Sequence, residues 1–196
     1  MVLVPHRDLL LITGSEDEDG QRRVARVALD ALLTPRALDG RALRWKAGAW
    51  EPFMPERLSE ASADFRQLAL FTRARDYDDQ TELLEKHFAD SGEDVFVAAF
   101  TPYQDERGRS LGYAVWQKGT PSLLPRADLL FFVDPALGER APPVAVARWE
   151  DVAKVLPALQ TPVEGLYPER YRVSDFPAAE QLARWNSDPG ELLDAP

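Results

Sequence analysis

The sequence predicts an α+β fold in which helices pack on a mixed or mostly antiparallel sheet. Short apolar runs of β character are interspersed irregularly with stretches of helical spacing, whereas a doubly wound fold needs strict alternation of strands and helices. Hydrophobic residues make up 45% of the 196 residues and charged residues 29%, which is the balance of a globular chain. The five Trp, five Tyr and nine Phe favour a packed core, because disordered chains are poor in aromatics.

The first third of the chain is predicted to form short strands around one helix. The periodicity places strands over 2–4, 9–12 and 43–45 and a helix over 21–33. An acidic turn, residues 14–20, precedes the helix, where the helix dipole favours negative charge. Pro52 and Pro55 are expected to stop regular structure after the third strand.

The middle of the chain is predicted to hold two helices and then a hairpin. Ser59 is an expected N-cap for the first helix, which reaches Phe71, and Asp76, Asp78 and Asp79 are expected to cap the second, over 78–89. The remaining elements are strands over 95–100, 111–116, 129–133, 144–147 and 171–173, and helices over 149–159 and 177–185. The run over 129–133 is apolar throughout, which indicates a central strand buried on both faces.

Residues 4–12 resemble residues 124–132, with a proline, an aspartate and two leucines in the same register. Each copy is followed by a helix, a Thr-Pro pair and a short strand, which suggests a duplicated strand–helix–strand unit. A match this short also arises by chance, so duplication and coincidence both stay open. If the duplication is real, Pro5 and Pro125 begin equivalent strands, and Asp8 and Asp128 accept hydrogen bonds from turn amides.

The expected organisation is a single globular domain over residues 1–196. Within it, pseudo-repeats over 1–55 and 120–186 would flank a helical and hairpin insert over 56–119, and the tail over 187–196 would be frayed. The segment Val4-Pro5-His6-Arg7-Asp8-Leu9-Leu10-Leu11, followed by a helix and Ala49-Trp50-Glu51-Pro52-Phe53, resembles the YtpQ-like family of uncharacterised bacterial proteins. The resemblance covers about the first quarter of the chain, His6 departs from the expected Asn, and the family supplies no activity.

Composition bounds the compartment and the partners. The formal charge is −10, which disfavours nucleic acids and anionic membranes as partners, because phosphate binding depends on cations. The chain has no cysteine, which removes disulfides and thiolate chemistry, and its longest apolar run is far shorter than the ~20 residues of a membrane span. Pro5 and early charges leave no signal-peptide core. We therefore expect a cytoplasmic protein.

Motifs that would carry chemistry are not recognisable. Ser15, Asp17 and Asp19 fit the start of a calcium loop, but Arg26 stands where the bidentate Glu belongs, so the segment is interpreted as a helix-start turn. The histidines, His6 and His87, lack metal-ligand spacing, and His87 is interpreted as a packing residue. We predict no catalytic residue, no metal site and no cofactor.

Aromatic residues supply the candidate site. A core position is predicted for Trp45 and Trp116, whereas Trp50 and Phe53 lie in the proline-broken segment and are the candidate partner-binding residues. The function expected first is a non-enzymatic protein-binding or adaptor module. An acidic inhibitor or immunity protein that neutralises a basic partner is the second hypothesis, and an enzyme whose site no motif reveals is the third. The oligomeric state is left open.

Overall fold

The structure is a computed structural model that describes residues 1–56, 59–104, 109–138 and 140–185. It has an α+β fold with mostly antiparallel sheets, as the sequence predicts. The chain divides into two compact units: unit 1 comprises residues 1–75 and 104–110, and unit 2 comprises residues 76–103 and 111–196. The predicted tail over 187–196 lies outside the described residues.

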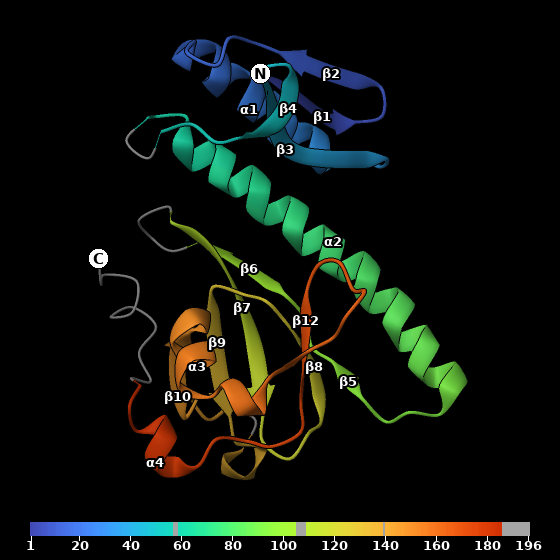
Figure 1. Cartoon of the computed structure of the whole chain (residues 1–196), viewed down its shortest axis with the longest axis vertical. Helices are drawn as coiled ribbons and strands as arrows, with labels where there is room; N and C mark the ends of the chain where they lie inside the picture. Colours follow the sequence, from blue (N-terminus) through green and yellow to red (C-terminus); the bar gives the residue numbers. More distant parts are fainter. Residues whose placement is uncertain (57–58, 105–108, 139, 186–196) are drawn as a thin grey trace. The chain divides into compact units, whose positions relative to one another are not determined.

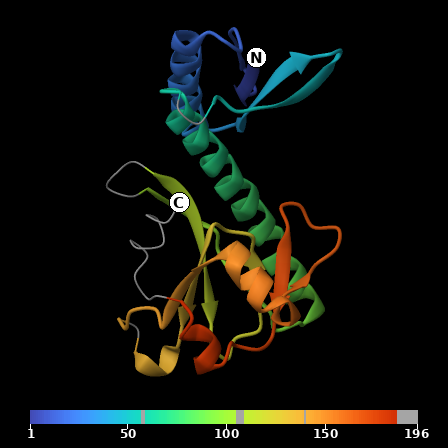
Figure 2. The ribbon, with the colours of Figure 1, turned by 60° about the vertical axis from the view of Figure 1, so that its left-hand side comes forward.

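Unit 1 is a four-stranded antiparallel sheet with strand order β2-β1-β3-β4 (Figure 1). Its elements are β1 (Val2–His6), β2 (Leu9–Ile12), α1 (Glu18–Leu32), β3 (Ala37–Lys46), β4 (Ala49–Phe53) and the first half of α2 (Ser62–Ser91). Strand β4 departs from the sequence prediction, in which Pro52 ends regular structure. Since β4 is an edge strand, Pro52 needs no ladder partner for its missing N–H. Figure 2 shows β3 and β4 as a long hairpin.

The core of unit 1 lies between one face of this sheet and the helices. Leu3, Ala42 and Phe53 point to that face and pack against Ala25 and Ala28 of α1. Phe65 and Leu68, from the first half of α2, complete the cluster. Small residues on α1 let this helix approach the strands closely. Gly40 also permits a close approach, because a Cβ there would lie 2.8 Å from Leu32 Cδ1, and its amide donates to Thr72 Oγ1 over 2.9 Å.

The two helices predicted over 59–71 and 78–89 are one continuous helix, α2. The prediction of a break was wrong because residues 72–78 contain neither Gly nor Pro, and isolated aspartates do not end a helix. Asp76, Asp78 and Asp79 therefore lie inside the helix and cap nothing. The apolar residues of α2 serve both units, with Phe65 and Leu68 in unit 1 and Tyr77 and Phe88 in unit 2.

Unit 2 contains two four-stranded sheets, ordered β10-β9-β7-β6 and β11-β12-β8-β5. The strands are β5 (Phe96–Val97), β6 (Thr101–Gln104), β7 (Ser110–Gln117), β8 (Ser122–Pro125), β9 (Leu129–Val133), β10 (Ala145–Arg148), β11 (Thr161–Pro162) and β12 (Arg170–Val173). Helices α3 (Trp149–Val155) and α4 (Ala179–Leu182) and short 3-10 turns at Pro135–Leu137 and Pro157–Leu159 complete it. Strand β9 lies between two neighbours and is largely buried, as predicted.

The segments that resemble each other in sequence pair differently. Strands β1 and β2 form an antiparallel hairpin, whereas β8 and β9 belong to different sheets. Pro5 lies inside β1 and Pro125 ends β8, so neither proline begins its strand. Asp128 accepts a hydrogen bond from the Gly112 amide over 2.6 Å, which is a strand amide of β7. Neither unit coincides with the ranges 1–55 and 120–186, and the duplication stays a prediction.

Candidate protein-binding surface

The sheet of unit 1 has an outer face, opposite α1 and α2, that carries apolar side chains from all four strands. The strand register aligns Ile12, Val2, Leu43 and Pro52 in one row across the sheet. Side chains two residues along a strand share a face, so Leu10, Val4, Trp45 and Trp50 belong to the same surface. We call this surface the outer face, and these eight residues are its apolar members. The strands of an antiparallel sheet with one solvated face normally alternate apolar and polar residues, so that the solvated face is polar. In this sheet the solvated face is largely apolar.

The outer face is largely exposed in the described chain, with Val2 half-buried among the other members. Ile12 is 70% exposed, Leu10 59%, and Val4 and Leu43 40% each. Single exposed apolar residues are ordinary, but contiguous patches of a few hundred square ångströms mark interaction surfaces. The outer face is contiguous in this way, because its members are cross-strand neighbours rather than scattered residues, and it is therefore the candidate surface.

Two tryptophans stand side by side at the hairpin end of the outer face. Trp45 and Trp50 are direct cross-strand partners and are 59% and 56% exposed. Their ring centroids lie 5.3 Å apart at an interplanar angle of 68°, an edge-to-face pair. Exposed Trp is rare on inert surfaces and enriched among the residues that dominate binding energy. The core position predicted for Trp45 was therefore wrong, whereas Trp116 is buried as predicted.

The two candidate residues of the sequence lie on opposite faces of β4. Trp50 is on the outer face, and Phe53 is 8% exposed and belongs to the core of unit 1. The Phe53 ring packs edge-to-face on Phe65 with centroids 6.1 Å apart. Because the sequence indicates irregular structure over residues 49–53, it does not predict that Trp50 and Phe53 point to opposite faces of a strand.

Phe53 also lines an apolar cleft of about 250 Å³ at the end of β4. Met54, Phe65 and Ala69 form its walls with Phe53, and Gly40, Arg41, Ala42 and Pro52 complete the lining. Its volume is below the 300–1,000 Å³ typical of small-molecule sites. A cleft of this size can hold a single large apolar side chain.

Charge on the outer face is confined to one pair. Asp39 and Arg41 of β3 share the alternation of Leu43, and the Arg41 Nη2 lies 2.8 Å from Asp39 Oδ2. A second bond joins Arg41 Nε to Asp39 Oδ1 over 2.9 Å. The two charges therefore compensate each other, and the surface around them is close to neutral.

The negative charge of the chain is concentrated elsewhere. Residues 76–103 of unit 2 contain eight acidic residues and one basic residue, Lys86. On α2, Asp78, Asp79, Glu82 and Glu85 are exposed. Burial raises the pKa of Asp78, and the charge of Asp79 adds to this rise. The second half of α2 is thus a strongly anionic helix surface.

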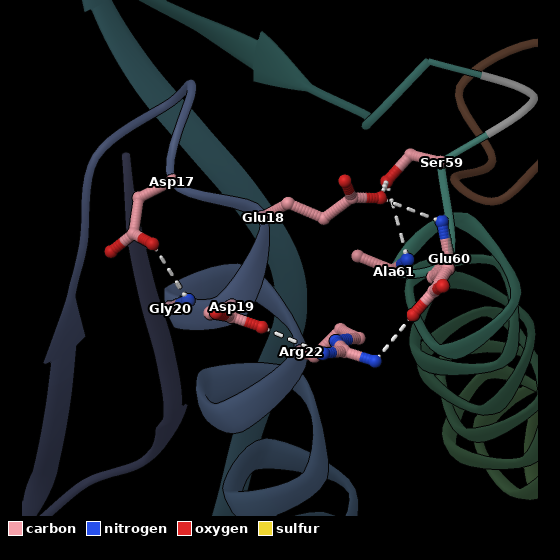
Figure 3. A network of polar contacts seen from close by, with 8 residues as sticks. All are labelled: Asp17, Glu18, Asp19, Gly20, Arg22, Ser59, Glu60 and Ala61. Atoms are coloured by element: carbon pink, nitrogen blue, oxygen red, sulfur yellow. Dashed lines mark hydrogen bonds and ion pairs between the residues drawn. The ribbon is translucent and has the colours of Figure 1, made fainter.

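The acidic turn of unit 1 is a structural device, as predicted. Asp17 caps α1, because its Oδ1 accepts the Gly20 amide over 3.0 Å (Figure 3). This hydrogen bond, supported by the Thr13 hydroxyl, lowers the pKa of Asp17. Helix α1 begins at Glu18, three residues before the predicted start.

Glu18 and Arg22 connect the start of α1 to the start of α2. Glu18 Oε1 accepts the Ser59 hydroxyl over 2.7 Å and the Glu60 amide over 2.8 Å, and both bonds lower the pKa of Glu18 (Figure 3). Arg22 donates to Asp19 over 2.6 Å and to the Glu60 carboxylate. Asp17, Glu18 and Asp19 thus each bond to groups of unit 1, which accounts for these three acidic residues at the start of α1.

The histidines contribute no assembled site. His6 Nε2 lies 2.9 Å from the Pro35 carbonyl, and Nδ1 accepts the Asp8 amide over 3.1 Å. His87 is exposed on α2 beside the Phe88 ring, so the packing role predicted for it was wrong. Within the described ranges, no group of three or more acidic or histidine side chains is placed to hold a metal ion.

Comparisons of the chain with protein-family models, with curated proteins and with solved structures found no match. Among the helices of the described ranges, none is long and apolar enough to cross a membrane.

Sequence reasoning missed most of the outer face. The signal that could have found it is the run Leu9-Leu10-Leu11-Ile12, which has no polar residue in alternation. Such a run predicts a strand buried on both faces. In the structure it forms edge strand β2, where helices cover only one face, so half of its side chains are left exposed.

Proposed function

We propose that this chain is a non-enzymatic protein-binding module and that its docking surface is the outer face of unit 1. The observation that carries the proposal is the set of apolar side chains that lie next to one another across all four strands, among which Ile12, Leu43 and the Trp45–Trp50 pair are exposed. Leaving such a surface in water is unfavourable by roughly 25 cal/mol per Å² of apolar area. A partner that covers it regains this free energy.

The composition of the surface fits protein recognition. Interface centres are depleted in charge and rich in aromatic residues, and Trp is among the commonest hot-spot residues. The outer face has two Trp and one self-compensated ion pair. A rigid sheet also limits the entropy that binding costs, because its side chains are held in a fixed array.

The test is affinity capture from the native lysate with wild-type bait and with an Ile12→Lys, Trp50→Ser bait. We expect proteins captured by the wild type to be lost from the variant, at low and at high salt alike, because the surface is close to neutral. Circular dichroism and thermal melting would show that the variant folds. Identical capture by both baits would refute the outer face as the docking surface.

A second candidate function is supported by the anionic half of α2. An inhibitor or immunity protein that neutralises a basic partner would use Asp78, Asp79, Glu82 and Glu85, which are exposed on unit 2. Charge complementarity of this kind accelerates association and is weakened by salt. Capture of a basic protein that is lost at high salt, and lost in an Asp79→Lys, Glu82→Lys bait, would favour this function over the first.

The YtpQ-like resemblance of the first quarter of the chain stays a prediction and adds no activity to either proposal. A cytoplasmic location likewise stays part of the proposal. It is supported by the absence of cysteine from the sequence, which suits a reducing compartment.

A further inference from the structure

We propose that the occupant of the outer face is a second copy of this chain, bound face to face through the same residues. The inference rests on the proposed function, since it names the partner of that surface. A two-fold axis makes such an interface self-complementary, so that each apolar row meets the equivalent row of the other copy. Sheets pack in this way about 10 Å apart with their side chains interleaved.

The size of the surface fits a dimer. The exposed fractions of Val4, Leu10, Ile12, Leu43, Trp45 and Trp50 range from 40% to 70%. Together they amount to on the order of 600 Å² of apolar surface per copy, compared with about 800 Å² per partner in a standard interface. Pro52 and the strand margins supply a rim. One copy therefore offers close to what a stable association needs.

The charge distribution permits self-association despite the formal charge of −10. Residues 1–75 contain twelve basic and eleven acidic residues, so the net negative charge belongs to unit 2. On the outer face itself, Asp39 and Arg41 are bonded to each other. Two copies of this face consequently bring together no uncompensated like charges, which would oppose docking.

The same neutrality argues against a highly charged occupant. A basic or acidic partner would find no unpaired opposite charge among the strand residues of this face, and would lose its own hydration in contact with Trp and Leu. The second copy presents the same neutral apolar surface and is always present at equal concentration. A second copy is therefore the neutral, apolar partner that this surface favours.

The experiment is sedimentation velocity of the full-length protein over a hundredfold range of concentration. We expect the wild-type protein to sediment as a species whose mass is twice the 22.0 kDa of one chain. Leu43→Lys, on the central strand, and Ile12→Lys, on edge strand β2, are each expected to weaken the dimer by about a hundredfold or more, because each dimer would bury two lysines. Salt between 50 and 500 mM should change the wild-type dimer little.

The matched control is Leu33→Lys, the same substitution in the same unit at a site that is 78% exposed but lies at the end of α1. This variant should remain a dimer.

If Leu43→Lys fails to fold, Ile12→Lys decides alone, since its side chain supports no core contact. Wild type that is monomeric at all concentrations, or dimers that persist in the folded face variants, would overturn the inference. A monomer whose lysate partners are still lost in the face variants would leave the proposed function standing.

Discussion

Arg170 of β12 donates a hydrogen bond from its Nε to Oε1 of Gln80 on α2, over 2.6 Å, and both side chains are buried. The guanidinium is fully buried, and its remaining hydrogens also find acceptors. These are the carbonyl oxygens of Ala98 at 2.8 Å, Leu123 at 3.0 Å and Tyr77 at 3.4 Å, and Thr81 Oγ1 at 2.7 Å. Arg170 therefore joins the second half of α2 to the strands of unit 2.

Arg170 remains charged at neutral pH. Burial lowers its pKa to about 10, the opposing influences being Tyr77, Asp78 and Glu85. Its direct hydrogen-bond partners are neutral groups, and the guanidinium also lies over the Tyr77 ring at 5.2 Å. A buried cation held in this way is costly to disturb, because each partner that loses it is left unsatisfied.

Replacing Arg170 with Met should therefore destabilise unit 2 by about 3–5 kcal/mol, since the substitution leaves several buried acceptors without donors. Urea unfolding followed by circular dichroism measures the change. The control is Arg172→Met, two residues along the same strand, where the exposed guanidinium lies 3.6 Å from Glu93. That change should cost less than about 1 kcal/mol. Equal losses in both variants would contradict the role of the Arg170 network.

The hydrogen bonds to Glu18 predict an acid-dependent stability. The folded-state pKa of Glu18 is lowered, first by the Ser59 hydroxyl and then by the Glu60 amide. The stabilising contribution is therefore present above the unfolded pKa of Glu, about 4.3, and is lost as pH falls through the lower folded value. Glu18→Gln should lower Tm by roughly a few degrees at pH 7 and by less at pH 3.

The control for Glu18 is Glu16→Gln, a change in the same exposed turn. Its Tm should follow that of wild type at both pH values. If the Tm difference between wild type and Glu18→Gln is the same at both pH values, ionisation of the Glu18 carboxylate does not contribute to the stability of the fold.

Alternation in β4 predicts opposite outcomes at Trp50 and Phe53. Phe53→Ala should cost about 3–5 kcal/mol in the free energy of unfolding, because the ring packs on Phe65 in the core. Trp50→Ala should change stability by about 1 kcal/mol or less, since the ring is 56% exposed, yet it should weaken docking at the outer face. Chemical unfolding and sedimentation measure the two effects. A large stability loss at Trp50 would refute its assignment to the binding surface.

How far sequence reasoning reached can be seen in three places. The apolar run over 129–133 is a central buried strand, because a run without alternation needs cover on both faces. The break predicted within α2 was wrong, because tertiary packing on both units favours a continuous helix over local capping by aspartates. Trp45 could not be placed, since composition does not tell which face of a two-sided strand the helices cover. The proposed docking surface thus depends on strand register, which the sequence does not specify.

Gly112 of β7 should not tolerate a side chain. The Phe100 ring occupies the position that a Cβ would need, and the same ring stacks on Tyr77 with centroids 5.1 Å apart. Gly112→Ala should cost about 1–3 kcal/mol by overpacking. The double variant Gly112→Ala, Phe100→Leu should lose less than the sum of the single losses, because the smaller side chain frees the space. Additive losses in urea unfolding would contradict the contact.

Asp78→Asn should stabilise the isolated protein while weakening its anionic surface. Burial and Asp79 raise the folded pKa of Asp78, so its ionised form is disfavoured by folding at neutral pH. The substitution removes that penalty, and the free energy of unfolding at pH 7 should rise by less than about 1 kcal/mol, since the residue is exposed and solvent screens its charge. The gain should shrink as pH falls through the raised pKa, because wild type then binds the proton itself.

Urea unfolding at pH 7 and pH 4 measures the difference, with the exposed Asp90→Asn as the control on the same helix. Lower stability of Asp78→Asn at pH 7 would show that the carboxylate stabilises unit 2 and would remove the reason to assign it to a basic partner.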